Sequence, residues 1–138
     1  MSKPTVLALA MTDEALAPLR LLCIKNKIRL RSIPNTDPSL SLTLGALCAN
    51  ESIEGKETEP LPEPILLLAN MTDSELSQFI NQMKVKKIKR PSLMAILTET
   101  NSLWTPLALW GELSAEREAF LKMQRESAHN HEHHHHYE

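Results

Sequence analysis

The chain has 138 residues, of which 42% are hydrophobic and 23% are charged. A chain of this length usually forms one domain, and this hydrophobic content is enough to fill a core. The formal net charge of −2 argues against a general electrostatic attraction to nucleic acid or acidic lipid. The apolar run from Val6 to Met11 is too short for a signal peptide or a membrane span. We therefore expect a cytoplasmic protein that does not enter a membrane, with Cys23 and Cys48 as buried thiols.

The first half of the chain predicts a strand, a helix, a second strand and a second helix. The strand Val6–Ala10 is apolar on both faces, as in the buried strands of a parallel sheet. Thr12 is a suitable N-cap for the helix that follows, and a second strand is expected at Ile28–Ile33. An Asp-Pro pair at 37–38 predicts the start of another helix, which ends near Ala49.

Residues 50–63 are acidic and rich in proline, a composition that does not bury a core. We interpret this segment as a linker between two halves, residues 4–49 and 64–125. Together they form a single α/β domain over residues 1–127, followed by a disordered His-rich tail at 128–138.

The second half predicts the same order of elements. Ile65–Ala69 is another strand that is apolar on both faces. Thr72 and Glu75 have the spacing of a capping box, which predicts the start of a helix. A second strand is expected at Ser92–Leu97, and a Thr-Pro pair at 105–106 predicts the start of the last helix.

The two halves also resemble each other in sequence. Residues 6–16 (VLALAMTDEAL) align with residues 66–76 (LLLANMTDSEL) at a spacing of 60 residues. Each short strand–helix–strand unit implies a right-handed parallel crossover. The sequence therefore predicts two β-α-β-α halves that form a four-stranded, mostly parallel sheet flanked by helices. A ferredoxin-like α+β arrangement of the same elements is the alternative.

A polar segment lies where the last predicted strand leads into the last helix, and ligands of open α/β sheets bind outside the carboxyl ends of strands. Its candidate ligand-binding residues are Thr98, Thr100, Asn101 and Trp104. The free N–H groups of the helix that starts near Thr105 favour an anion at the same place. The alternative is structural, because Thr and Asn also build turns and a Trp before a helix packs as a hydrophobic staple.

This segment resembles a small bacterial family known as domain of unknown function 3783. Its members typically show Lys-Ala-Val-Leu-Thr-x-Thr-Asn-x-x-Trp where this chain has MAILTETNSLW at 94–104. The earlier segment LTLGAL at 42–47 resembles a second family pattern, Pro-Leu-Gly-x-Leu. The resemblance covers about residues 3–122 and implies the fold and the bounds of the domain. It implies no reaction, and Met94 stands where relatives carry a lysine.

Two basic groups follow the first helix of each half, at Lys25, Lys27, Arg29, Arg31, Lys86, Lys87, Lys89 and Arg90. Since their places in the halves are equivalent, we expect them at one pole of the sheet, opposite the 98–104 turn. Phosphate or nucleic acid docking there is a weak alternative. Cations near helix C-termini are favoured by about 0.3–1 kcal/mol each in any case, and no aromatic residue is interleaved for base stacking. A solvated charged surface is the favoured interpretation, and nucleic acid is not an expected partner.

The tail contains all six histidines of the chain, at His129, His131, His133, His134, His135 and His136. Neutral imidazole binds Zn²⁺ and Ni²⁺, so these residues are candidate metal ligands and these ions candidate cofactors. A purification-tag remnant, or a native tail that binds metal without biological purpose, would have the same composition.

The predicted folded region contains no histidine, and the chain has no Cys-x-x-Cys and no glycine-rich phosphate loop. A Ser-His-Asp or Cys-His relay is thereby excluded there. The sequence favours a non-enzymatic binding or interaction module, with a protein partner as one option. The alternative function is metal association through the tail.

Overall fold

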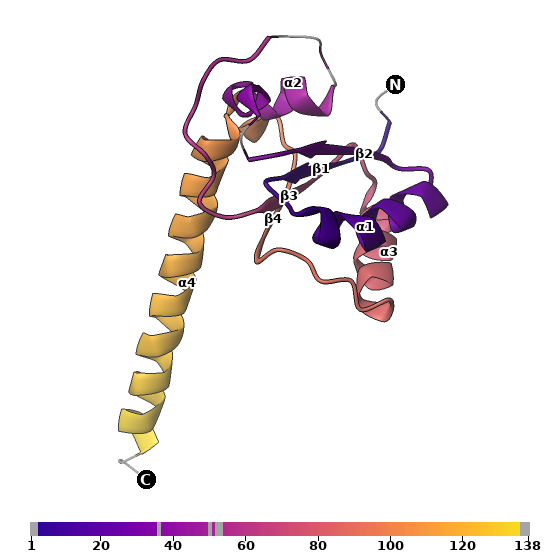
Figure 1. The fold of residues 1–138 in the computed structure, drawn as a ribbon. Helices are drawn as coiled ribbons and strands as arrows, with labels where there is room; N and C mark the ends of the chain where they lie inside the picture. Colours follow the sequence, from indigo (N-terminus) through magenta and orange to yellow (C-terminus); the bar gives the residue numbers. More distant parts are fainter. Residues whose placement is uncertain (1–2, 36, 50, 52–53, 136–138) are drawn as a thin grey trace.

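The computed structural model describes residues 3–35, 37–49, 51 and 54–135, with side chains up to residue 127 (Figure 1). The first half contains β1 (Thr5–Leu9), α1 (Asp13–Lys25), β2 (Arg29–Ile33), the 3₁₀ helix η1 (Pro38–Ser41) and α2 (Leu44–Cys48). The second half contains β3 (Ile65–Ala69), α3 (Asp73–Val85), β4 (Leu93–Ile96), the 3₁₀ helix η2 (Asn101–Leu103) and α4 (Pro106–His135).

The four strands form one sheet in the order β2-β1-β3-β4. The β1–β2 and β3–β4 pairs are parallel, whereas β1 and β3 are antiparallel. The predicted α/β fold with a mostly parallel sheet is therefore confirmed, with the antiparallel pairing at the junction of the halves. In that pairing Leu7 lies opposite Leu67, its counterpart 60 residues later. The register is symmetric about this pair, because Val6 lies opposite Leu68 and Ala8 lies opposite Leu66.

Helices α1 and α3 cover one face of the sheet (Figure 1). Both begin after a threonine whose hydroxyl accepts a backbone N–H, Thr12 in α1 and Thr72 in α3. Only Thr72 completes the predicted capping box with Glu75. Leu19 and Phe79 lie at equivalent places in the two helices, and both are 1% exposed in the same core cluster.

The opposite face is covered by η1, α2 and the first turns of α4 (Figure 1). The single helix predicted from 37 to about 49 is wrong, because Leu42 and Thr43 are extended and separate η1 from α2. The Thr43 hydroxyl accepts the N–H of Ala46 and starts α2 anew. The described part of the 50–63 linker has no helix or strand, but the expectation that it buries nothing is wrong at Leu61, which is 4% exposed in this core.

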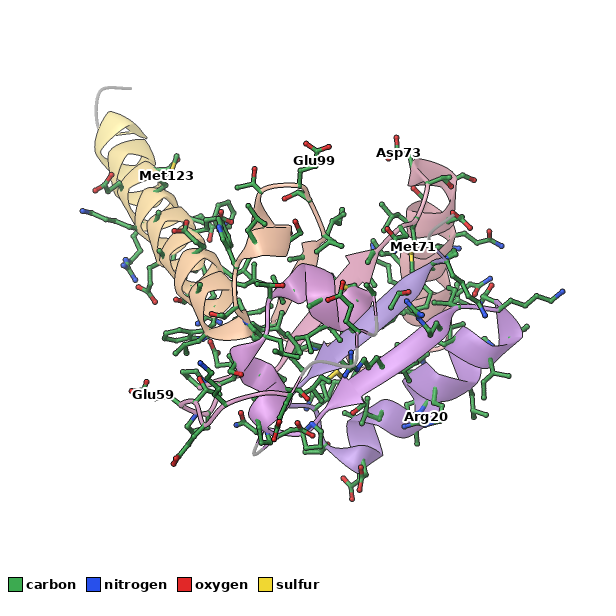
Figure 2. All side chains as sticks on the ribbon, turned by 90° about the horizontal axis from the view of Figure 1, so that it is seen from above. Arg20, Glu59, Met71, Asp73, Glu99 and Met123 are labelled. Atoms are coloured by element: carbon green, nitrogen blue, oxygen red, sulfur yellow. The ribbon has the colours of Figure 1, made fainter. Side chains whose placement is uncertain are left out.

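Helix α4 runs without a break at Gly111 or Ser114 and projects past the sheet (Figure 1). Its first turns are anchored, since Leu109 is buried and Arg117 forms an ion pair of 2.8 Å with Glu63. Further along, Phe120 is 58% and Met123 67% exposed, and Figure 2 shows Met123 on the projecting part. The sequence predicts a disordered tail after residue 127, whereas the helical backbone continues to His135.

Candidate functional site

The turn between β4 and η2 is organised by Asn101, which is 8% exposed. Its side-chain oxygen accepts the N–H of Thr98 at 2.8 Å, and its amide nitrogen donates to the carbonyl of Ile96 at 3.0 Å. The Thr98 hydroxyl in turn accepts the N–H of Asn101 at 3.0 Å. The polar groups of Asn101 and the Thr98 hydroxyl thus bond to the turn's own backbone.

The other two predicted ligand residues differ in their surroundings. Trp104 is half-buried and packs against the core beneath α2. Thr100 is exposed and its side chain makes no capping bond. Glu99, beside it, points away from the body of the protein in Figure 2. A ligand held by these four side chains together stays a prediction, and the geometry gives Thr98, Asn101 and Trp104 structural roles.

The two segments that carry the family resemblance contact each other. Helix α2 packs on η2, and the N–H of Leu44 donates to the carbonyl of Trp104 at 2.8 Å. A Cβ atom on Gly45 would lie 3.1 Å from the carbonyl oxygen of Ser102. A glycine at this position therefore lets α2 approach the turn closely.

A cavity of about 390 Å³, which we call the open corner, lies beside this contact. It is found at the carboxyl ends of β3 and β4, where they meet the start of β1 and the end of α2. Its lining residues are Lys3, Arg29, Gly45, Cys48, Ala49, Asn70 and Leu97. Only Arg29 of these seven was a candidate binding residue in the sequence, and the other six were not.

Two arginines fix the C-terminal end of α2 beside the open corner. Arg29 donates to the Cys48 carbonyl and, at 3.1 Å, to the Thr5 hydroxyl, and Arg31 donates to the Leu47 carbonyl at 2.8 Å. Burial raises the pKa of the Cys48 thiol to about 11, although both arginines oppose this shift. The thiol is therefore protonated at neutral pH and is a poor nucleophile.

A second place, in the other half of the chain, is compared with the open corner by chain position, and we call it the closed corner. Thr43 and Thr105 each accept the N–H of the residue three positions later, so α2 and the start of α4 correspond at a spacing of 62 residues. Cys48 then corresponds to Trp110. Lys3, in the Lys-Pro pair before β1, corresponds to Glu63, in the Glu-Pro pair before β3.

The closed corner is filled by side chains of the protein itself. Trp110 packs against the hydrophobic core and its indole N–H donates to Glu63 at 3.1 Å. Arg117 donates to both carboxylate oxygens of Glu63, at 3.1 and 2.8 Å. The hydrogen bonds from Arg117 and Trp110 hold the pKa of Glu63 below its ordinary value. The Cys48–Trp110 correspondence depends on the caps of α2 and α4 in the structure, so the 60-residue alignment of the sequence does not reveal the open corner.

The predicted basic pole is wrong as a single surface, because antiparallel β1 and β3 put the starts of their partner strands at opposite ends of the sheet. Arg29 starts β2 and lies opposite Thr5 at the start of β1, whereas Lys89 and Arg90 line another cavity, of about 400 Å³, with residues that follow β1. The two groups approach each other at Lys25 and Lys86, where Lys25 lowers the pKa of Lys86. Lys27 and Lys87 share a positive φ, 57° and 55°, just after α1 and α3.

Among the described residues, no cluster of three or more His, Cys, Asp and Glu side chains is arranged to hold a metal ion. The side chains of His129 to His136 lie outside the described residues, so the predicted metal site of the tail stays a prediction. No helix in the part of the chain that the structure describes is both long and apolar enough to cross a bilayer.

Residues 64–120 match the family described as Domain of unknown function (DUF3783). The matched segment starts before β3 and ends within α4. It contains the 98–104 turn, Trp110 and Arg117. The first half, with α2 and most of the open corner, lies outside the match, although the sequence suggested a resemblance over residues 3–122. No curated protein and no solved structure gave a significant match to the chain. The second half of the chain, residues 64–120, is therefore similar to the DUF3783 family.

Proposed function

We propose that this domain is a non-enzymatic binding module whose ligand occupies the open corner. The observation that carries the proposal is the asymmetry between two related places in one fold. Trp110 fills the closed corner, whereas the smaller Cys48 leaves a cavity of about 390 Å³ at the carboxyl ends of β3 and β4. Ligand sites of α/β sheets occur at such strand ends, and cavities of roughly 300–1,000 Å³ hold small molecules.

The surroundings of the cavity support binding rather than catalysis. The thiol of Cys48 is held protonated by burial. The other side chains of the lining supply positive charge, an amide and apolar surface, without a general base. The proposal includes two further interpretations of the sequence. The first is that the two halves are copies of one β-α-β-α plan. The second is that the protein acts in the cytoplasm, where buried thiols such as Cys23 and Cys48 stay reduced.

Ligand-observed NMR on the full chain tests the proposal with a library of small metabolites. We expect a subset to bind and to stop binding in Ala49→Trp, because Ala49 is exposed and lines the cavity. The matched control is Ala108→Trp, an exposed helical alanine that is not part of the lining. Hits that survive Ala49→Trp, or no hits at all, would contradict the proposed site. Consumption of a hit in the same samples would contradict its non-enzymatic character.

A further inference from the structure

The charge of the open corner points to the class of its ligand, an inference that rests on the proposed function. Lys3 and Arg29 both line the cavity. Among the described residues, the one ion pair within 4.0 Å joins Arg117 to Glu63, so neither cation of the open corner has a carboxylate at that distance. No Asp or Glu belongs to the lining. We infer that the ligand is a small organic molecule with an anionic group, a carboxylate or a phosphate, that Lys3 and Arg29 bind.

The closed corner shows what the same fold does with a carboxylate at the related place. Glu63 lies there between the guanidinium of Arg117 and the indole N–H of Trp110. In the open corner the corresponding residue is Lys3, so the sign of the charge is reversed. A positive group without an acidic neighbour is satisfied by an anion from outside the chain, as Arg117 is by Glu63.

The positions of the two cations also suit this role. The guanidinium of Arg29 is held by the Cys48 carbonyl and the Thr5 hydroxyl, so its orientation is fixed before a ligand arrives. Lys3 is exposed. Its backbone carbonyl accepts a hydrogen bond of 3.4 Å from the side chain of Asn70, and this bond joins the segment before β1 to another lining residue of the cavity. Preorganised donors bind an anion with little loss of side-chain entropy. The other cavity with basic lining residues, beside Lys89 and Arg90, also includes Glu14 and is therefore a weaker anion site.

Matched pairs of ligands test the inference on the full chain. The library holds aliphatic and aromatic carboxylates, the amide of each, and the corresponding phosphate monoesters, all at neutral pH. We consider the compounds that bind the natural chain and no longer bind the Ala49→Trp variant. Among these compounds we expect acids to bind about tenfold or more tightly than their amides, since one charge-assisted hydrogen bond has this effect. The carboxylate and phosphate arms show which anionic group is preferred.

Two variants separate charge from fold. Lys3→Gln is expected to weaken the acids about tenfold and to leave any amide binding unchanged. Lys27→Gln, which removes an exposed lysine outside the lining, is expected to leave both unchanged. Amides that bind as tightly as acids, or acids unaffected by Lys3→Gln, would overturn this inference and leave the proposed site standing. If no compound loses its binding in Ala49→Trp, both this inference and the proposed site are overturned.

Discussion

The two halves share one plan and differ most in their last helices. Helix α2 has 5 residues and ends at Cys48, whereas α4 has 30 residues and continues through Trp110 and Arg117. The corresponding strands and first helices are similar in length, and α1 and α3 both have 13 residues. The two corners therefore differ at the second helix of each half, where Cys48 lines the cavity of the open corner and Trp110 packs against the core at the closed corner.

The largest expected effect comes from opening the closed corner. Trp110→Cys removes an aromatic ring that packs against the core and a hydrogen bond to Glu63. We expect it to lower the free energy of unfolding by about 3 kcal/mol, measured by urea denaturation. Cys48→Ala, at the equivalent position, removes one buried sulfur atom and should cost about 1 kcal/mol. Equal costs for the two variants would contradict the distinction between a filled and an open corner.

The second comparison concerns two polar side chains in the segments before α2 and α4, Asp37 at the start of η1 and Asn101 in η2. Asn101→Ala leaves the Thr98 N–H and the Ile96 carbonyl without their partner, so we expect a loss of about 3 kcal/mol. Asp37→Ala removes an N-cap bond of 2.8 Å to Ser39 and should cost about 1 kcal/mol.

The stability losses in Asp37→Ala and Asn101→Ala should also differ in their dependence on pH. Bonds from Ser39 lower the pKa of Asp37 in the folded protein, so its contribution is present above its ordinary pKa and disappears as pH falls through the lowered value. The Asn101→Ala cost should stay constant over that range because an amide does not titrate there. A constant cost for Asp37→Ala down to about pH 2 would show that the carboxylate does not cap η1.

Local signals in the sequence predicted the elements better than their assembly. The strand Ile65–Ala69 and the Thr72–Glu75 cap depend on neighbouring residues, and both appear with the predicted bounds. The antiparallel pairing of Leu7 with Leu67 depends on how the linker returns the chain, which no local pattern encodes. That one pairing put the starts of β2 and β4, with Arg29 and Arg90 near them, at opposite ends of the sheet, although the two basic groups still meet at Lys25 and Lys86.

The candidate site was predicted only at its edge. The 98–104 segment was identified from its residue types and family resemblance, and it forms a turn whose polar groups are already used. The open corner beside it draws Lys3, Arg29, Cys48 and Asn70 from four separate segments. Their spacing follows no motif, so three-dimensional structure was needed to bring them together.

The third comparison sets the Glu63–Arg117 ion pair against the unpaired cations of the open corner. Arg117→Ala should lower the free energy of unfolding only slightly at pH 7, since both side chains are about one-third exposed and solvent screens the pair. The pKa of Glu63 is lowered in the folded protein, so this cost should be complete above its ordinary pKa and disappear as pH falls through the lowered value. Thermal unfolding at pH 7 and pH 3 measures the difference. Lys3→Ala, by contrast, should leave stability unchanged within about 0.5 kcal/mol at either pH, and a larger loss would show that Lys3 has an intramolecular partner.

The smallest effect on stability is expected from the part of α4 that has no counterpart in α2. A chain that ends at Ser127 should unfold within about 0.5 kcal/mol of the full chain, because Phe120 and Met123 are already exposed before that point. Zinc binding, measured by calorimetry at neutral pH, should disappear with the tail if its histidines are the metal ligands. Zinc binding that persists in the shortened chain would contradict the predicted role of His129 to His136.

The most direct test of the central claim is to map where an anion binds on the full, ¹⁵N-labelled chain by NMR. A carboxylate identified by the library screen is titrated in, and backbone shift changes are compared between the two corners. The account predicts changes concentrated at Lys3, Arg29, Gly45 and Asn70, with none at the corresponding Ala10 and Glu63 of the closed corner. Changes of equal size at both corners, or changes confined to the closed corner, would contradict it.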